Sequence, residues 1–340
     1  MAIIKKKKIT YKISAGLTQF LLRYNRYLEI PIHYKDLTRY ESALPLYDHL
    51  DEDTLWKTVI YSHSDRELIY LDLKKIYAIL KASGDTSVMK HLYIERVDIC
   101  TYGNTQPFRV RVVNKLNDNF DYFYIKQADA SRVYGLELED ILSPNRISYL
   151  VHEQTLIEEH ISGLPGDQFI KEYLDDPKIN KIRMGKEFVK FNERCFVRLL
   201  GDMHSSNYVV VVTPDFEETD FKLRAIDFDQ QSYEGRKSIY LPQYFKQNNP
   251  IIKMGIEAMI PETVNQYKKE ERSMMGNRLK TSEHKISSLL RAMKADTLST
   301  PENINTLKND LADYYKYPAF LKCKNMGEIL ETSLSLLFIQ

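Results

Sequence analysis

The sequence predicts an α+β fold in which an antiparallel sheet is followed by a mainly helical half. Between residues 93 and 127, apolar and polar side chains alternate, which is typical of half-buried strands. Over 10–90, and again after 166, apolar residues recur at helical spacing. The turn-forming stretch 162–166, Ser-Gly-Leu-Pro-Gly, divides the sheet region from the second helical region.

Composition excludes several classes of protein. Hydrophobic residues make up 43% of the 340 residues, so the chain can bury a core and is not disordered. Lys plus Arg number 48 and Asp plus Glu 47, a formal net charge of +1. Proteins that coat nucleic acid usually carry a concentrated basic excess, so we expect no nucleic-acid partner.

The cysteines and apolar runs indicate the compartment. Cys100, Cys195 and Cys323 are far apart and form no C-x-x-C pair, which fits a reducing cytosol and offers no zinc site. Polar residues follow the lysine run 5–8, where a signal peptide would be apolar. The apolar run 208–212 is far shorter than the ~20 residues that span a bilayer. We therefore expect a cytoplasmic protein without a membrane partner.

The chain divides into three predicted parts. Residues 1–92 form a helical extension, 93–163 a lobe built on the sheet, and 164–340 a mainly helical lobe. Five strands are expected in the sheet, at 93–99, 108–112, 120–125, 147–152 and 155–161. A helix over 128–142 separates the third strand from the fourth, and five antiparallel strands with one inserted helix are the simplest packing.

A loop and hairpin over 201–229 carry the strongest chemical signal. The loop G-D-M-H-S-S-N (201–207) lies between a helix predicted over 180–196 and the strand 208–212, and a returning strand ends at Asp227. A tight hairpin would therefore bring Asp202, Asn207 and Asp227 to one edge. In phosphoryl transfer a carboxylate orients the attacking hydroxyl and takes its proton, while an amide oxygen and a second carboxylate hold Mg²⁺.

G-D-M-H-S-S-N followed by I-D-F-D (226–229) resembles the catalytic hairpin of the protein-kinase-like phosphotransferases, closest to the aminoglycoside phosphotransferase and choline kinase branch. That branch has H-G-D-x-H-x-x-N and then I-D-[FW]-[DE], and Leu200 stands where it commonly has His. The resemblance implies a two-lobed kinase-like fold with ATP in the cleft. It also implies that Asp202 is the catalytic base and that Asn207 and Asp227 bind magnesium. Asp229 is then an additional metal ligand.

Further residues are assigned to ATP by the same resemblance. Lys126 ends the third strand, where these kinases place the lysine that contacts the α- and β-phosphates. Glu137 or Glu139, in the following helix, is expected to pair with it. The segment 158–163 resembles the hinge between lobes, whose backbone would bind adenine. The hinge residues assigned to this role are Glu159, His160 and Ile161.

The expected activity is an ATP- and Mg²⁺-dependent transfer of the γ-phosphate to a hydroxyl of a small molecule. The sequence has no A-P-E segment, and I-D-F-D lacks the glycine of D-F-G, which favours a small-molecule acceptor over regulated protein kinases. Two alternatives stay open: an atypical bacterial protein kinase of the toxin–antitoxin type, acting on a protein substrate, and a nucleotide-binding pseudokinase acting as an interaction module. Leu200 motivates the pseudokinase, as does Gly103, the only glycine between the first two strands. The sequence specifies neither the acceptor nor the oligomeric state.

Overall fold

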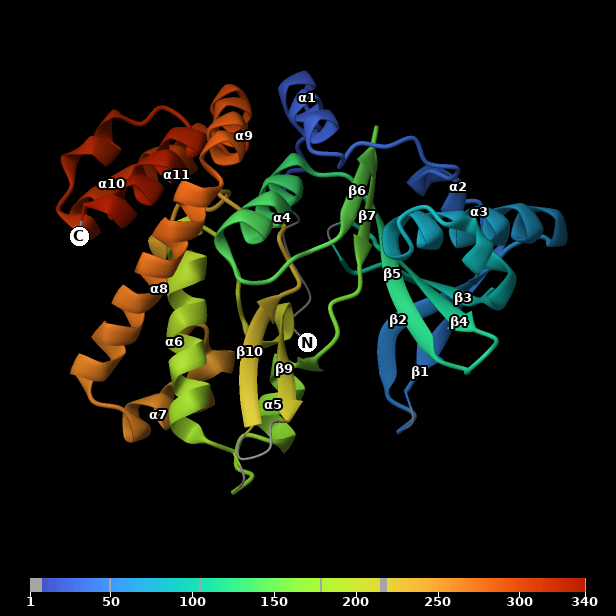
Figure 1. The fold of residues 1–340 in the computed structure, drawn as a ribbon, viewed down its shortest axis with the longest axis horizontal. Coiled ribbons are helices and arrows are strands. Elements are labelled where there is room, and N and C mark those ends of the chain that lie inside the picture. Colours follow the sequence, from blue (N-terminus) through green and yellow to red (C-terminus); the bar gives the residue numbers. More distant parts are fainter. Residues whose placement is uncertain (1–7, 49, 104, 178, 215–218, 340) are drawn as a thin grey trace. The chain divides into compact units, whose positions relative to one another are not determined.

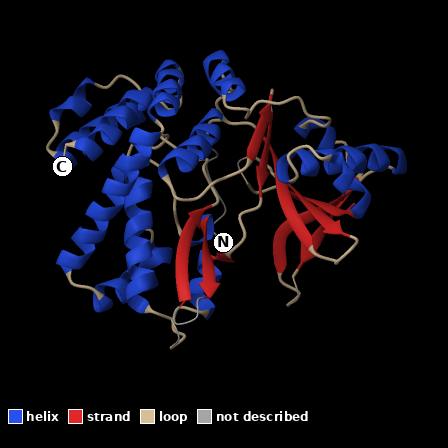
Figure 2. Ribbon diagram, in the orientation of Figure 1, coloured by secondary structure: helices blue, strands red, loops and turns tan. Residues whose placement is uncertain are grey.

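The computed structural model describes residues 8–48, 50–103, 105–177, 179–214 and 219–339 (Figure 1). Most of the lysine run and of the acidic turn after 214 therefore lies outside the described residues. The fold is α+β, with an antiparallel sheet of seven strands and a second sheet of three (Figure 2). Contacts divide the chain into two compact units. The first comprises 1–130 and 147–160, and the second comprises 131–146 and 161–340.

The first unit contains the seven-stranded sheet, in the order β1-β2-β3-β4-β5-β7-β6 with antiparallel neighbours throughout. Its strands are β1 (Ser42–Tyr47), β2 (Asp53–Ile60), β3 (Leu92–Cys100), β4 (Phe108–Asn114), β5 (Phe120–Gln127), β6 (Tyr149–His152) and β7 (Thr155–Glu159). Its helices are α1 (Ala15–Arg23), α2 (Tyr34–Leu37), α3 (His63–Lys81) and the 3₁₀ turn η1 (Thr86–His91).

The prediction of a five-stranded sheet was wrong, because β1 and β2 lie inside the stretch assigned to a helical extension. β1 is an edge strand with mostly exposed side chains, so it has no clear alternation of apolar and polar residues. It also contains Pro45, and proline is tolerated in a sheet at the edge. The described part of 1–92 is therefore partly helical and partly sheet.

One face of the seven-stranded sheet holds the core of the first unit. The helix α3 covers this face and packs Ile69, Leu73 and Ile76 against the buried side chains of the strands (Figure 1). Because side chains alternate along a strand, Phe123 and Ile125 of β5 face this core. Lys126 consequently lies on the other face of the sheet, which β5 also lines with half-buried tyrosines.

The second unit is mainly helical. Its helices are α4 (Ala130–Leu142, with Ala130 at the unit boundary), α5 (Gly166–Glu172), α6 (Lys181–Arg198), α7 (Asn249–Ala258), α8 (Pro261–Thr281), α9 (Glu283–Ala295), α10 (Pro301–Tyr315) and α11 (Met326–Ser335). Its strands are β8 (Leu164–Pro165), β9 (Tyr208–Pro214) and β10 (Thr219–Ala225). Short 3₁₀ turns are η2 (Ser205–Asn207), η3 (Lys237–Tyr240), η4 (Pro242–Tyr244), η5 (Lys246–Asn248), η6 (Pro318–Lys322) and η7 (Leu336–Phe338). Contacts group α4 with this unit, whereas the sequence placed it in the lobe with the sheet.

The helix α6 forms the centre of the second unit and contacts α7, α8, α11 and β10 (Figure 1). It begins after Asn180, whose side chain accepts a hydrogen bond from the N–H of Arg183 at 3.1 Å. Its second half is buried and includes Arg194, which pairs with Glu187 at 2.8 Å and with Glu271 at 3.2 Å. The Glu271 pair connects α6 with α8, and the loop over 201–207 follows α6 directly.

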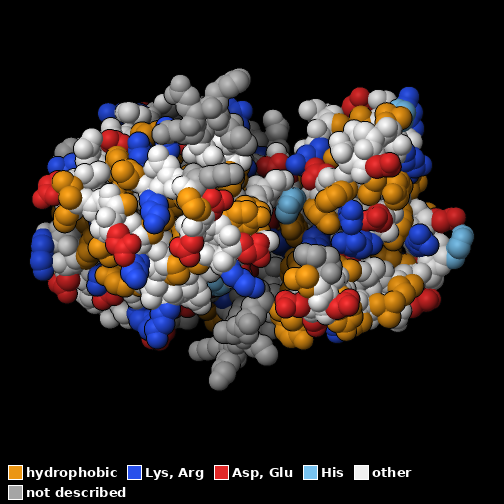
Figure 3. Space-filling model, turned by 90° about the horizontal axis from the view of Figure 1, so that it is seen from below, with side chains coloured by type: hydrophobic (Ala, Val, Ile, Leu, Met, Phe, Trp, Pro, Cys, Tyr) orange, Lys and Arg blue, Asp and Glu red, His pale blue; other side chains and the backbone are white. Residues whose placement is uncertain are grey.

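Surface properties agree with the near-zero net charge. The face shown in Figure 3 carries acidic, basic and apolar side chains interspersed. In the described part of the chain, every helix is too short or too polar to cross a membrane.

Candidate active site

The loop over 201–207 is held by backbone contacts at both ends. α6 ends at Arg198, and its C-cap residue Leu199 has a left-handed conformation (φ 58°) that turns the chain into the loop. The N–H of Gly201 then donates to Gln230 O at 3.1 Å, and the N–H of Asp202 donates to Ile239 O at 3.0 Å. Asp202 itself has φ 62°, a conformation that Asp tolerates better than most residues. The segment 230–239 therefore fixes the position of Asp202.

The β9–β10 hairpin brings Asn207 and Asp227 to the same loop. The side chain of Asn207 donates through Nδ2 to the backbone oxygen of Asp202 at 2.8 Å. The N–H of Ile226, at the end of the returning strand, donates to the backbone oxygen of Asn207 at 3.0 Å. Asp202, Asn207 and Asp227 are thus connected. Asn207 is hydrogen-bonded to Asp202 and to Ile226, and Ile226 directly precedes Asp227 in the chain.

Arg132, in the first turn of α4, lies against the two aspartates of I-D-F-D. Its Nη1 is 2.8 Å from an oxygen of Asp227 and 2.8 Å from an oxygen of Asp229, and its Nη2 donates to Ile226 O at 3.2 Å. The N–H of Asp229 also donates to Asp227 at 3.0 Å. Arg132 is only 2% exposed. One buried guanidinium group therefore compensates two carboxylates, and nothing in the sequence pattern around Arg132 indicated this role.

The Asp202 carboxyl is partly protonated at neutral pH. Burial is the main reason that its pKa is raised to about 7, and repulsion by neighbouring carboxylates adds to the effect. These carboxylates are, in decreasing order of effect, Asp227, Glu234 and Asp229. A carboxyl with a pKa near 7 is well matched to taking up a proton at neutral pH.

His204 supports the loop. Burial lowers its pKa, and its Nδ1 accepts a hydrogen bond from the N–H of Ser206 at 3.3 Å. A neutral imidazole whose Nδ1 is occupied by the backbone caps the turn η2. Leu200, where the kinase branch commonly has His, is fully buried and paired with Gln231 in an isolated bridge. Packing and backbone pairing thus hold this end of the loop.

Two side chains of the hairpin carry oxygen atoms that could serve as magnesium ligands. Among the described residues, no group donates to Oδ1 of Asn207, whose Nδ2 is fixed on Asp202, so this oxygen can serve as a ligand together with the Asp227 carboxylate. Within the described ranges, no cluster of three or more His, Cys, Asp or Glu side chains is placed to hold a metal. Magnesium would therefore need oxygens from water and phosphate besides these two side chains, as is usual for nucleotide-bound Mg²⁺.

Asn248 makes buried hydrogen bonds to the loop 201–207 and to two neighbouring segments. This residue is fully buried before the first turn of α7. Its Nδ2 donates to Met203 O at 3.0 Å and to Pro242 O at 2.8 Å, and its Oδ1 accepts from the hydroxyl of Tyr208 at 3.0 Å. Asn248 therefore satisfies a carbonyl of the loop and fixes it to α7. Sequence reasoning gave Asn248 no role, because its contacts are with distant residues.

The predicted ATP-binding lysine lies in the first unit. Lys126 is 7% exposed, and its Nζ is 2.8 Å from Glu158 Oε2 on the neighbouring strand β7. Glu137 and Glu139 make buried ion pairs inside the second unit, with Lys285 at 2.8 Å and with Arg198 respectively. The pairing of either glutamate with Lys126 stays a prediction, and Glu158 is a partner that the sequence did not indicate.

The predicted hinge coincides with a passage of the chain from one unit to the other, between His160 and Ile161. The backbone N–H groups of Glu159 and His160 donate to Ser148 O at 3.0 Å and to Tyr122 O at 3.3 Å. Within the described part of the chain the N–H of Ile161 makes no hydrogen bond. Ile161 therefore keeps a free backbone donor of the kind that adenine would accept.

Comparison with known proteins gives no assignment: no protein-family model matches the chain, and no curated protein matches it.

Proposed function

We propose that the protein is an ATP- and Mg²⁺-dependent phosphotransferase that moves the γ-phosphoryl group to a hydroxyl of a small molecule. The observation that carries this proposal is the geometry of the hairpin. Asn207 donates to the backbone of Asp202 and is bonded through its own backbone to Ile226, next to Asp227. This geometry supports a base and two metal ligands held at one edge by short contacts.

In the proposed reaction, Asp202 orients the acceptor hydroxyl and accepts its proton. A bond forms between the hydroxyl oxygen and the γ-phosphorus, and the bond from that phosphorus to the leaving oxygen of ADP breaks. Asn207 and Asp227 would hold Mg²⁺, which when bound compensates the negative charge of the phosphates. Lys126, which is paired with Glu158, would contact the α- and β-phosphates.

The segment after Asp229 supports a small-molecule acceptor. Gln231 and Ser232 are buried, and the N–H of Ser232 donates to Leu199 O at 2.8 Å. Gln231 donates through Nε2 to Arg198 O at 2.5 Å. Directly after the hairpin, the chain is therefore hydrogen-bonded to the C-terminal end of α6. Regulated protein kinases have a mobile activation segment at this point. A site built in this way does not need a phosphorylation event to become ordered.

The test is phosphate transfer from ATP to a panel of hydroxyl-bearing metabolites, followed by phosphorus NMR and mass spectrometry of the products. We expect a Mg²⁺-dependent product that disappears in Asp202→Asn and Asp227→Ala. Asp220→Asn is the matched control, because Asp220 is an exposed aspartate on β10 of the same hairpin. Phosphate found on the protein chain itself would instead identify the atypical protein kinase. Unchanged turnover in Asp202→Asn would contradict the proposed role of Asp202.

A second candidate, the nucleotide-binding pseudokinase, is favoured by one observation. Arg132 places a fixed positive charge on both Asp227 and Asp229, where a catalytic site would place a metal ion. A protein that uses a guanidinium group in this way could bind nucleotide without magnesium. Stabilisation of the protein by ATP in the presence of EDTA, with no product formed in the panel, would select this candidate.

A further inference from the structure

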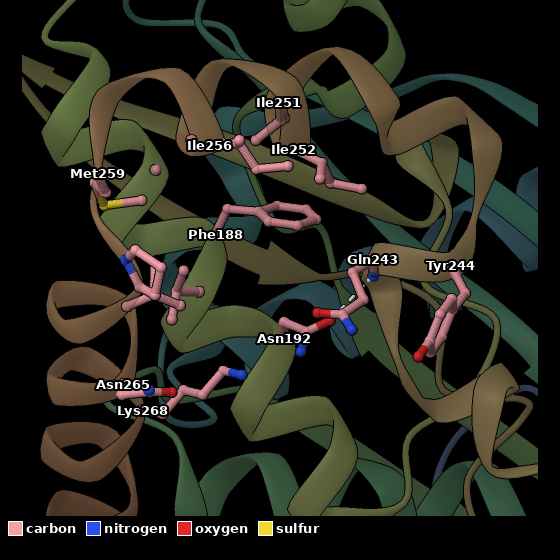
Figure 4. A pocket seen from close by; sticks show the side chains of 15 residues that line it. Phe188, Asn192, Gln243, Tyr244, Ile251, Ile252, Ile256, Met259, Asn265 and Lys268 are labelled. Carbon is pink, nitrogen blue, oxygen red and sulfur yellow. Dashed lines mark hydrogen bonds between the residues drawn. The ribbon is translucent and has the colours of Figure 1, made fainter.

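A cavity of about 510 Å³ lies in the second unit between α6, α7 and α8 (Figure 4). Its volume is within the range of small-molecule sites, which is about 300–1,000 Å³. None of the residues assigned to phosphoryl transfer lines it. It therefore has to be explained separately from the proposed kinase site.

One side of the cavity is apolar. Phe188 of α6 faces three isoleucines of α7 across the space, with Met259 at one end (Figure 4). The glycines Gly185 and Gly255 let α6 and α7 approach each other, because a Cβ on Gly185 would lie 2.7 Å from the Met259 methyl group. The close approach places this methyl group between the two helices. The result is a continuous hydrocarbon surface that suits an alkyl chain.

The other side carries a hydrogen-bond donor on a buried residue. Asn192 of α6 is 3% exposed, and its Oδ1 accepts the N–H of Gln243 at 3.0 Å. Because that N–H can only donate, Oδ1 must face Gln243, and the NH₂ group of Asn192 is directed away from it. Among the described residues, no acceptor contacts this NH₂ group, although Asn192 lines the cavity. The NH₂ group is therefore accessible only through the cavity, where a ligand that supplies an acceptor can bind it.

The same side carries the cavity's positive charge. Among the described residues that line the cavity, Lys268 of α8 is the only charged one. In the described part of the chain it forms no ion pair or hydrogen bond, and it is half-buried. Figure 4 shows its side chain extending from α8 toward the side of the cavity that holds Asn192. A fixed donor and an uncompensated ammonium group together match an anion that accepts hydrogen bonds.

We propose that this cavity binds an amphipathic carboxylic acid, with its hydrocarbon chain on Phe188 and the α7 isoleucines and its carboxylate on Asn192 and Lys268. The carboxylate accepts a hydrogen bond from the Asn192 NH₂ group and compensates the Lys268 charge. A cationic head group would be repelled by Lys268 and would leave Asn192 without an acceptor. A short acid would leave the apolar side of the cavity in contact with water.

The experiment is isothermal titration calorimetry of the full chain with sodium decanoate, kept below its micelle concentration. We expect saturable binding at one site, binding at least tenfold weaker for decanol, and no measurable binding for butyrate or decyltrimethylammonium. Failure of decanoate to saturate, or equal binding of decyltrimethylammonium, would overturn the proposal. Saturable binding of an apolar peptide without binding of decanoate would also overturn it.

Variants locate the binding site. Val264→Phe adds volume from α8 into the cavity and should abolish decanoate binding, whereas Ile260→Phe, at an exposed residue outside the lining, should not. Lys268→Gln should weaken decanoate at least tenfold and leave decanol unchanged, with Lys269→Gln as the matched control. Asn192→Asp keeps the acceptor for Gln243 and replaces the donor, so it should also abolish binding. Circular dichroism confirms folding, and decanoate binding that is unaffected in both Val264→Phe and Lys268→Gln would refute the site.

Discussion

The guanidinium group of Arg132 lies 2.8 Å from a carboxylate oxygen of Asp227, the residue that we expect to bind magnesium. The contact connects the first turn of α4 with the end of the β9–β10 hairpin, 95 positions later in the chain. The carboxylates of Asp227 and Asp229 therefore have a compensating positive charge without a bound metal ion. Removal of that charge is therefore the most direct way to expose what the edge binds.

Arg132→Met should lower the free energy of unfolding by about 2 kcal/mol in EDTA, because Asp227 and Asp229 lose their common partner. Added Mg²⁺ should recover more stability in this variant than in the wild type, since the metal then supplies the missing charge. Urea unfolding with and without Mg²⁺ measures both effects. Arg236→Gln, at an exposed arginine, is the control. An equal Mg²⁺ response in Arg132→Met and wild type would mean that the ion does not bind at these aspartates.

Asp202→Asn should stabilise the metal-free protein in a pH-dependent way. The folded-state pKa of Asp202 is raised from 3.8 to about 7, so the folded protein holds a proton that the unfolded chain releases. In the wild type, the protonated Asp202 carboxyl therefore contributes its full share of the folding free energy below about pH 4. This contribution is lost as the pH rises to about 7. The advantage of Asp202→Asn should grow over the same window, to at most about 4 kcal/mol, and then level off. Thermal unfolding of both proteins across this range measures it; an advantage that does not change with pH would show that Asp202 is not protonated in the fold.

Lys126→Met should destabilise the first unit, because it leaves the Glu158 carboxylate buried without its ion-pair partner. The expected loss is about 3 kcal/mol. Adding Glu158→Gln to this variant should restore part of the stability but none of the ATP affinity, since Lys126 is the proposed phosphate contact. Chemical unfolding and nucleotide titration of the single and double variants separate the two roles. Full ATP affinity in the double variant would exclude Lys126 from the nucleotide site.

Asn248→Ala should loosen the loop 201–207. It removes the donor for Met203 O and Pro242 O and the acceptor for the Tyr208 hydroxyl, all in a fully buried position. Leaving these groups unsatisfied should cost about 3 kcal/mol. Hydrogen exchange of the loop 201–207 should accelerate more than exchange in α9. Uniform acceleration throughout the unit would indicate a general loss of stability and no specific support of the loop.

Sequence patterns predicted the parts of the fold that repeat locally. Alternation located β3, β4 and β5, and the spacing of polar residues in 201–229 located the hairpin, because both are properties of short stretches. β1 was not predicted, because an exposed edge strand with Pro45 lacks the alternation of apolar and polar residues that is typical of a strand. The ion-pair roles of Arg132 and Glu158 were not predicted, because the partner of each residue is brought close only by tertiary packing. The aspartates near Arg132 are more than 90 positions away, and Glu158 is 32 positions from Lys126.

Asn248 connects the loop of the proposed nucleotide site with the helix that lines the proposed carboxylate site. It holds Met203 in the loop 201–207 and directly precedes α7, whose isoleucines line the apolar side of the cavity. If a cavity ligand shifts α7 between two arrangements that hold Met203 differently, it changes the affinity of the loop for nucleotide, and nucleotide changes the affinity of the cavity by the same factor. Titration of decanoate at several fixed ATP concentrations would measure this reciprocity, and one buried amide would be the point through which it passes.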